Sequence, residues 1–297
     1  MAANTPLRGL IAPGSRTFAV ARRTVSRTFE DGFIHSGNLA YLAMLALFPF
    51  FILGAALFQL IGGPEQAETL VLTVVAGLPP AVAEEIRPAA LAAVHARTGW
   101  VLWLGAIIAL WTVSSLIETI RDILRRAYDA DSQGTAFWRY RLGSIGLILA
   151  SVVAMMLSLF AQVAIGAAQQ VILSAFPQLG EFIALLRIGR LVPAVLLGVS
   201  LWALFYSLTP QPFRNGDCPK WPGAAATTAW WIAVATALPV ILRYFLSFDL
   251  TYGSLAGIMV TLFFFWLIGL GVVIGAELNA ALAREGDADE TAKEVAL

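Results

Sequence analysis

The chain has 297 residues, of which 59% are apolar and 13% are charged, and its formal net charge at pH 7 is zero. A soluble domain carries about 25% charged residues, so this chain has too little polar surface to cover its apolar side chains in water. The composition therefore predicts an integral membrane protein, and zero net charge gives no support for nucleic-acid binding. The single cysteine, Cys218, excludes an intramolecular disulfide and cannot build a metal site by itself.

The first regular pattern occupies residues 14–37, before the first long apolar run. Apolar residues recur here at helical spacing while arginines take the other faces; they are Phe18, Ala21, Val25, Phe29 and Phe33, against Arg16, Arg22, Arg23 and Arg27. The pattern predicts an amphipathic helix on the inner leaflet, whose arginines contact lipid head groups or whose role is a simple anchoring elbow. The N-terminal residues lack the apolar core and cleavage site of a signal peptide, so we expect the first span to target the protein.

Charge-free runs predict the membrane spans. A run of about 20 uncharged residues must be helical in a bilayer, because its backbone has no water to bond to. Five such runs are plain, and a sixth covers 39 residues from 142 to 180. As a single helix the sixth run would be about 58 Å long, nearly twice the hydrocarbon thickness. The expected spans are about 39–61, 99–120, 142–172, 188–212, 221–246 and 250–280.

The sixth run is open to two interpretations, one span with an overhang or two spans. No Pro/Gly/Asn turn cluster separates its two halves, and the second half has four glutamines, Gln162, Gln169, Gln170 and Gln178. Glutamines make a poor lipid-facing span, so one span followed by an amphipathic overhang fits better. The distribution of Lys and Arg does not separate six spans from seven.

Clusters of arginine set the orientation. Residues 8–27 and 121–141 each hold five arginines, whereas residues 62–98 hold two arginines and four glutamates. By the positive-inside rule the two arginine-rich segments are cytoplasmic, and 62–98 is expected to form two short helices, before and after Pro79, over the outer face. The charged tail 281–297 is expected in the cytoplasm. No linker interrupts the pattern, so residues 1–297 are expected to form one membrane domain.

A search for catalytic or metal sites gives no candidate. The only histidines, His35 and His95, fall on opposite sides of the membrane in this topology, so they cannot share a metal or a catalytic dyad. Ser254 has no histidine in any span to activate it. Walker A, HExxH and GxSxG patterns are absent. We therefore expect no enzymatic activity, no cofactor and no metal.

Ionisable and amide groups near span ends are the remaining functional candidates, because they need partners or an aqueous path in hydrocarbon. The candidates for a polar path or gate are Glu118, Gln162, Arg243, Glu277 and Asn279. The alternative for Glu277 is an ion pair with an arginine at the inner interface, and for Arg243 it is snorkelling at the outer turn.

Helix-breaking and small residues mark hinges or close packing. Three prolines fall inside spans, and two small-xxx-small pairs lie in the last span: Pro49, Pro193 and Pro239, then Gly253 with Gly257 and Gly271 with Gly275. A proline kink can act as a hinge, although prolines are common in membrane bundles. The glycine pairs predict close helix approach, within the chain or between copies in a homo-oligomer.

Several stretches resemble motifs of the YihY/BrkB family of bacterial inner-membrane proteins. They are the first span from Leu39 to the proline at 49, residues 206–210 with the Trp-Pro-Gly-Ala at 221, and the closing motifs that begin at Tyr252 and Gly275. The resemblance implies six helices with both ends in the cytoplasm, which favours one span over 142–172. It also implies a role in moving lipid or envelope components. An older ribonuclease label of the family finds no His/Asp cluster in this chain that could activate water.

Two functions from different classes follow. The first is a transporter or translocator of lipid or another envelope component, with the polar candidates lining a path. The second is a non-transporting scaffold or envelope-assembly factor, in which residues 62–98 or the basic helix 14–37 dock a partner. Membrane lipids are the expected partners in both cases.

Overall fold

The computed structural model describes residues 15–61, 64–95, 100–130, 141–146, 148, 188–214, 218–245 and 255–295. Every regular element in these ranges is a helix, which confirms the predicted all-α class. The elements are α2 (Arg16–Arg27), η1 (Thr28–Gly32), α3 (Phe33–Ile61), α4 (Pro64–Ala76), α5 (Pro80–His95), α6 (Trp100–Ala127), α9 (Ile188–Leu208), α10 (Gln211–Arg214), α11 (Trp221–Phe245) and α13 (Ala256–Val295).

Four of these helices are long and apolar enough to cross a bilayer. The candidate spans are Phe33–Gly54, Trp103–Ala127, Trp221–Leu242 and Ala256–Glu285, and α9 adds a shorter apolar stretch, Ala194–Leu208. Each candidate span contains much of a charge-free run, which has to satisfy its backbone internally, and two of them continue into charged residues. The expected third span, 142–172, lies outside the described residues except for 142–146 and 148. Six spans therefore remain a prediction, while a membrane protein with several candidate spans is established.

The expected interfacial helix and first span are continuous, since α2, η1 and α3 follow one another without a gap. The expected boundary between residues 37 and 39 therefore has no counterpart in the helix bounds and stays a prediction for the membrane. Ser15 begins α2 as its N-cap, accepting a hydrogen bond from the Phe18 amide at 3.3 Å. The π-helical turn η1 then joins α2 to α3 without a break. Gly32 permits this turn to lie against α13, since a Cβ there would be 3.2 Å from Val273 Cγ1. The spacing of apolar residues in the sequence does not predict such a π-helical turn.

The last helix extends well past residue 280, where we expected the span to end and a separate tail to begin. α13 runs for 40 residues to Val295. The residues from 281 onward are rich in alanine and glutamate, which are strong helix formers, and no proline or glycine pair stops them. Arg284 also anchors this segment by donating a 3.2 Å hydrogen bond to the Ala127 carbonyl of α6.

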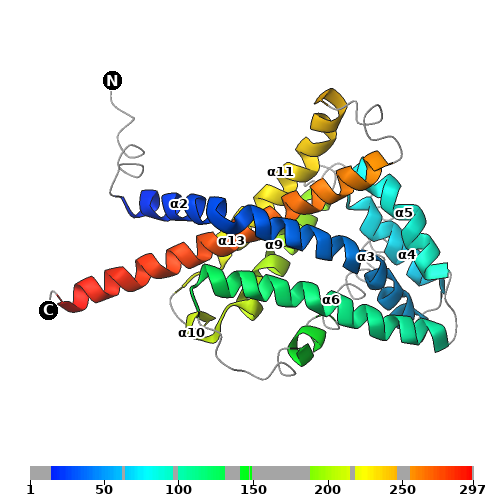
Figure 1. The fold of residues 1–297 in the computed structure, drawn as a ribbon, viewed down its shortest axis with the longest axis horizontal. Coiled ribbons are helices and arrows are strands. Elements are labelled where there is room, and N and C mark those ends of the chain that lie inside the picture. The colour runs from blue at the N-terminus through cyan, green and yellow to red at the C-terminus, as the bar shows by residue number, and fades with distance from the viewer. Residues whose placement is uncertain are drawn as a thin grey trace, which may run out of the picture.

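The helices divide the molecule into two ends. Figure 1 shows α2 and the C-terminal half of α13 projecting at one end and α4 with α5 lying at the other. α4 and α5 begin at Pro64 and Pro80, where a missing N–H costs nothing, and they form the two helices expected around Pro79. We call the end that contains α2, the C-terminus of α6 and the second half of α13 the basic end.

Apolar packing supports each end with its own core. One cluster gathers α3, α4, α5 and α6 around Phe51, and the other gathers α6, α9, α11 and α13 around Phe205; both phenylalanines have no exposed surface. Many large apolar residues on the span surfaces stay exposed, including Ile107 at 67% and Ile108 at 60%. Such a surface needs lipid rather than water, as expected for membrane helices.

Candidate functional site

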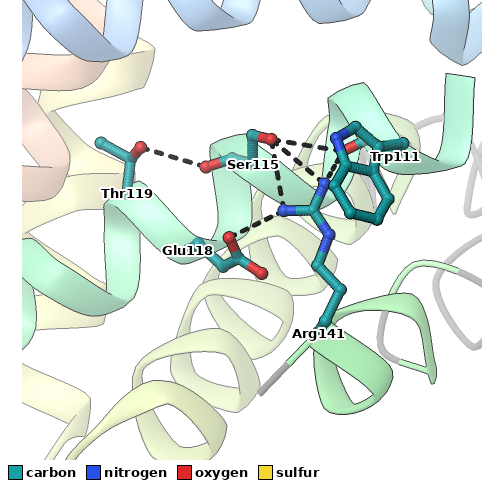
Figure 2. Close-up of polar contacts among 5 residues, drawn as sticks. All are labelled: Trp111, Ser115, Glu118, Thr119 and Arg141. Carbon is teal, nitrogen blue, oxygen red and sulfur yellow. Dashed lines mark hydrogen bonds and ion pairs between the residues drawn. The ribbon is translucent and has the colours of Figure 1, made fainter. Parts of the chain in front are cut away.

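A buried ion pair lies within the second candidate span. Arg141 reaches α6 from the short helix at 141–146 and donates a 2.8 Å charge-assisted hydrogen bond from Nη1 to Glu118 Oε2. Its Nη2 donates to the Trp111 carbonyl at 2.6 Å, and its guanidinium carbon lies 3.8 Å above the Trp111 ring centroid. Figure 2 shows the guanidinium between the ring, Ser115 and the carboxylate. The site therefore combines an ion pair with a cation–π contact.

Glu118 lies within α6 and not at its C-terminal end. We expected Glu118 at the inner end of a span, but α6 continues to Ala127, about two more turns. The Arg141 side chain is only 3% exposed, so removing it from water is costly unless its charge is compensated. The Glu118 carboxylate supplies the opposite charge, so the buried guanidinium depends on it.

Part of this buried site is unsatisfied. Within the part of the chain that the structure describes, Glu118 Oε1 and the hydroxyl oxygens of Ser114 and Ser144 are buried without a hydrogen-bond partner. Unpaired buried polar atoms cost on the order of 1–3 kcal/mol each, so a native fold seldom keeps them without a use. The arrangement offers a fixed cation, a carboxylate oxygen and two hydroxyls to a polar group entering the bundle.

Asn279, a candidate for the polar path, instead closes the N-terminus of α11. Its Oδ1 accepts a 2.8 Å hydrogen bond from the Gly223 amide, and its Nδ2 donates to the Lys220 carbonyl at 3.1 Å. The first amides of a helix have no partner inside that helix, so a side chain from another helix can cap them. Asn279 is 1% exposed, and both of its polar atoms are used in this contact.

The contact between α11 and α13 depends on glycines. A Cβ at Gly275 would lie 2.8 Å from the Gly223 carbonyl oxygen and 2.9 Å from Phe205 Cζ, and a Cβ at Gly271 would collide with Trp230 and Trp231. Thr227 uses the close approach to donate a 3.0 Å hydrogen bond to the Gly271 carbonyl. Small residues thus let two backbones meet, as at other membrane helix contacts.

The connection between α9 and α11 is held by two cations. Lys220 Nζ donates to the Cys218 carbonyl at 2.6 Å and also to the Phe213 carbonyl, while Arg214 donates to the Ser207 carbonyl at 2.6 Å. Burial lowers the pKa of Lys220 below its ordinary value, because the ammonium loses hydration. These cations cap the helix-terminal carbonyls of the turn.

A carboxylate joins three helices at the basic end. Asp129, just after α6, accepts a 2.8 Å hydrogen bond from Arg27 of α2 and a second hydrogen bond from Arg284 of α13. Partial burial by itself would raise the pKa of Asp129, but the hydrogen bonds from Arg284 and Arg27 outweigh it and lower the pKa. The hydrogen bond to Asp129 raises the pKa of Arg27. We call Arg27, Asp129 and Arg284 the clamp.

Glu277 lies close enough to the clamp to interact electrostatically with Arg27, Arg284 and Asp129. Among the described residues no ion pair joins Glu277 to an arginine, so the ion-pair alternative for Glu277 stays a prediction. Its position near the clamp separates Glu277 from the Glu118 site, which lies on α6 and the 141–146 helix.

The five polar-path candidates are therefore not brought to one place. Glu118, Glu277 and Asn279 take part in three different contacts, Gln162 lies outside the described residues, and the side chain of Arg243 in α11 is likewise not described. Of the hinge and packing candidates, Pro49, Pro193 and Pro239 lie inside α3, α9 and α11, and Gly253 is outside the described ranges. A Cβ at Gly257 would meet the Glu85 carboxylate. The hinge interpretation of the prolines stays a prediction.

A shallow cavity of about 330 Å³ opens at the basic end. It is lined by Ala19, Arg22, Arg23, Ser26, Arg27, Glu30 and Glu285. Three of the four arginines assigned to lipid head groups line it, and Arg16 does not. None of the polar-path candidates contributes to its wall.

Sequence reasoning missed the residues that make these contacts. Arg141 was counted only as a cytoplasmic charge, and Asp129 and Arg284 were not singled out. One sequence feature could have identified Arg141: it lies directly before a charge-free run, where an arginine must either extend to the membrane surface or point into the bundle. Only the fold shows which of the two occurs.

Comparisons with known proteins agree with the predicted likeness. Residues 27–296 match a family model described as "Virulence factor BrkB". A curated relative, "Putative ribonuclease-like protein YfkH" of Bacillus subtilis (strain 168), is 30% identical over 261 residues, covering 86% of this chain and 92% of the relative. No solved structure matches.

Proposed function

The chain belongs to the virulence factor BrkB family, and on that premise we propose that it is a multi-pass bacterial inner-membrane protein that translocates a lipid or another envelope component. In this proposal both termini are cytoplasmic, so the basic end faces the cytoplasm, and residues 1–297 act as one membrane domain. Arginine-rich segments at that end support the orientation through the positive-inside rule.

One observation carries the proposal, the ion pair between the buried Arg141 and Glu118 of α6. Ionisable groups inside a membrane bundle are costly and usually mark the path of a substrate or ion. The helices that supply the pair, α6 and 141–146, also carry Ser114 and Ser144, and among the described residues Glu118 Oε1 and both hydroxyl oxygens are buried without a partner. A polar head group passing the bundle could exchange hydrogen bonds with these atoms while its acyl chains stay in lipid.

Enzymatic activity has less residue-level support. The printed name of the Bacillus subtilis relative refers to a ribonuclease-like protein. Within the ranges that the structure describes, no group of three or more His, Cys, Asp or Glu side chains is placed to hold a metal ion. We therefore propose no nuclease step for this chain.

The scaffold alternative would use an exposed apolar surface. Among the described residues of α4 and α5, Leu72 is the one large apolar residue that is exposed, whereas α2 exposes Phe18 and Val25 and η1 exposes Phe29. A docking role would therefore involve α2 rather than the helices of residues 62–98.

The test is reconstitution of the full chain in vesicles with fluorescent phospholipids and small fluorescent solutes. We expect wild type to move lipid, and Glu118→Gln to slow it at least tenfold. Asp122→Asn is the matched control, because it breaks an exposed ion pair with Arg125 on the same helix and should leave the rate unchanged.

A double variant, Glu118→Gln with Arg141→Gln, separates function from folding. Glu118→Gln alone leaves a buried arginine uncompensated, which costs about 3–5 kcal/mol, while the double variant is neutral again. Recovered thermal stability without recovered translocation supports the proposal. Recovery of both, or translocation at the wild-type rate in Glu118→Gln, would reduce the pair to a structural role. Absence of flux in wild type favours the scaffold.

A further inference from the structure

We propose that the cavity between α2 and α13 binds the head group of a phospholipid that carries both a phosphate and a primary ammonium, a phosphoethanolamine head group. The inference concerns lipid binding at the basic end and does not depend on translocation. α2 and α13 contact each other, and both project at the same end of the molecule in Figure 1. Residues of α2, η1 and α13 line the cavity.

The cations of the cavity are available to a ligand. Arg27 is engaged with Asp129, but no hydrogen bond or ion pair to the described part of the chain holds Arg22 or Arg23. Ser26 lies in the same wall and donates a 3.1 Å hydrogen bond to Glu30. Guanidinium groups bind phosphate oxygens through paired charge-assisted hydrogen bonds, so Arg22 and Arg23 would take the phosphate.

The carboxylates of the cavity argue against a simple anion. Glu30 and Glu285 line the same space, one from the turn after α2 and one from α13. A purely anionic head group would meet two negative charges as well as the arginines. A head group with an ammonium pairs both signs, because its three N–H donors can reach the carboxylates while its phosphate reaches the arginines.

The surface beside the cavity suits acyl chains. Phe18, Val25 and Phe29 are 38%, 55% and 68% exposed, and their spacing places them along one face of the helical rod. Arg22 lies four residues from Phe18 and seven from Phe29, so it borders both the apolar face and the cavity.

This apolar face continues into the spans as a row of contacting rings. Phe29 meets Phe33 with centroids 5.4 Å apart, and Phe33 stacks on Trp266 of α13 at 5.6 Å. Trp266 in turn stacks on Phe263 at 6.0 Å. A lipid with its head group in the cavity could lay a chain along these rings, whereas a free head group would gain nothing from them.

The experiment measures which lipid the purified full-length protein retains. Native mass spectrometry from an equimolar mixture of phosphatidylethanolamine, phosphatidylglycerol and phosphatidylcholine with identical chains should show phosphatidylethanolamine retained about tenfold over the other two. Arg22→Gln with Arg23→Gln should lower retention of all three about tenfold. Glu30→Gln with Glu285→Gln should keep retention but remove the preference for phosphatidylethanolamine over phosphatidylglycerol.

Arg16→Gln is the matched control, because Arg16 lies on α2 and outside the cavity. If it weakens retention as much as the Arg22/Arg23 pair, general surface charge explains binding and the site is overturned. Equal retention of the three lipids by wild type, or a preference for phosphatidylglycerol, overturns the head-group assignment. Displacement of lipid by equimolar soluble glycerophosphoethanolamine would overturn the part played by the acyl chains. Unchanged melting temperatures exclude loss of folding as the cause.

Discussion

At the scale of single residues, the polar groups near the span ends differ in what they can do. Asn279 has both of its polar atoms used by the start of α11, whereas Glu118 has one buried oxygen without a partner among the described residues. A saturated group holds a fold together, while an unsaturated buried group can still accept a hydrogen bond from a ligand. We therefore interpret Asn279 as a residue that stabilises the contact between α11 and α13, and not as part of the proposed polar path.

Replacing the capping side chain should destabilise the protein. Asn279→Ala leaves the buried Gly223 amide without an acceptor, which costs about 1–3 kcal/mol. We expect a melting temperature lower by several degrees in detergent. Asn279→Asp keeps an acceptor for that amide but not the donor for the Lys220 carbonyl, so its loss should be smaller. Equal melting temperatures for wild type and Asn279→Ala would contradict the capping role.

The clamp at Asp129 should make the basic end acid-sensitive. Because its pKa is lowered in the folded state, the stabilisation is present above the unfolded value of about 3.9 and is lost as pH falls through the folded value. A fluorophore pair on α2 and α13 should report separation only below about pH 4. Asp129→Asn should separate them at neutral pH and remove this acid step. Asn tolerates the φ of 47° at this position, so backbone strain does not confound the comparison.

At the scale of elements, hydropathy does not predict two features, the junction of α2 with α3 and the contact of α11 with α13. A π-helical turn fuses α2 to α3, and glycines bring α11 against α13. In both cases glycine leaves room for a close contact: Gly32 lets η1 lie against α13, and Gly271 and Gly275 let α13 lie against α11. Glycine in a helix is otherwise unfavourable, so its use here points to packing.

A methyl group at the tight helix contact should therefore be costly. Gly275→Ala places a Cβ 2.8 Å from the Gly223 carbonyl oxygen, and overpacking of this kind costs on the order of 2 kcal/mol. Gly143→Ala is the control, since nothing lies within 4 Å of a Cβ there and alanine is the better helix former. Melting curves should show a decrease for Gly275→Ala and no decrease for Gly143→Ala. The same decrease in both would rule out the contact as the cause.

At the scale of the whole molecule, the two ends differ in chemistry. The basic end carries the clamp and the arginine-lined cavity, and the opposite end carries α4 and α5 over an apolar core. The predicted orientation would place the basic end inside and residues 62–98 outside, and it stays a prediction.

Labelling with a membrane-impermeant maleimide checks that orientation. In a Cys218→Ser background, Thr69→Cys on the exposed surface of α4 should react in cells whose inner membrane is intact but accessible from outside. Thr17→Cys on α2 should react only after the inner membrane is permeabilised. Both sites are exposed in the fold, so a difference in reactivity reports sidedness. Labelling of Thr17→Cys from outside would reverse the topology.

The sequence by itself determined that the chain is an all-helical membrane protein, where four of its candidate spans lie, and which family it resembles. These properties are local, because an uncharged run long enough to cross a bilayer must form a helix whatever its neighbours are. The partners of Arg141, Asp129 and Asn279 were decided only by the tertiary structure, since they join residues up to 155 positions apart, as between Arg284 and Asp129. Hydrogen bonds of this kind depend on which helix faces meet, and hydropathy carries no record of that.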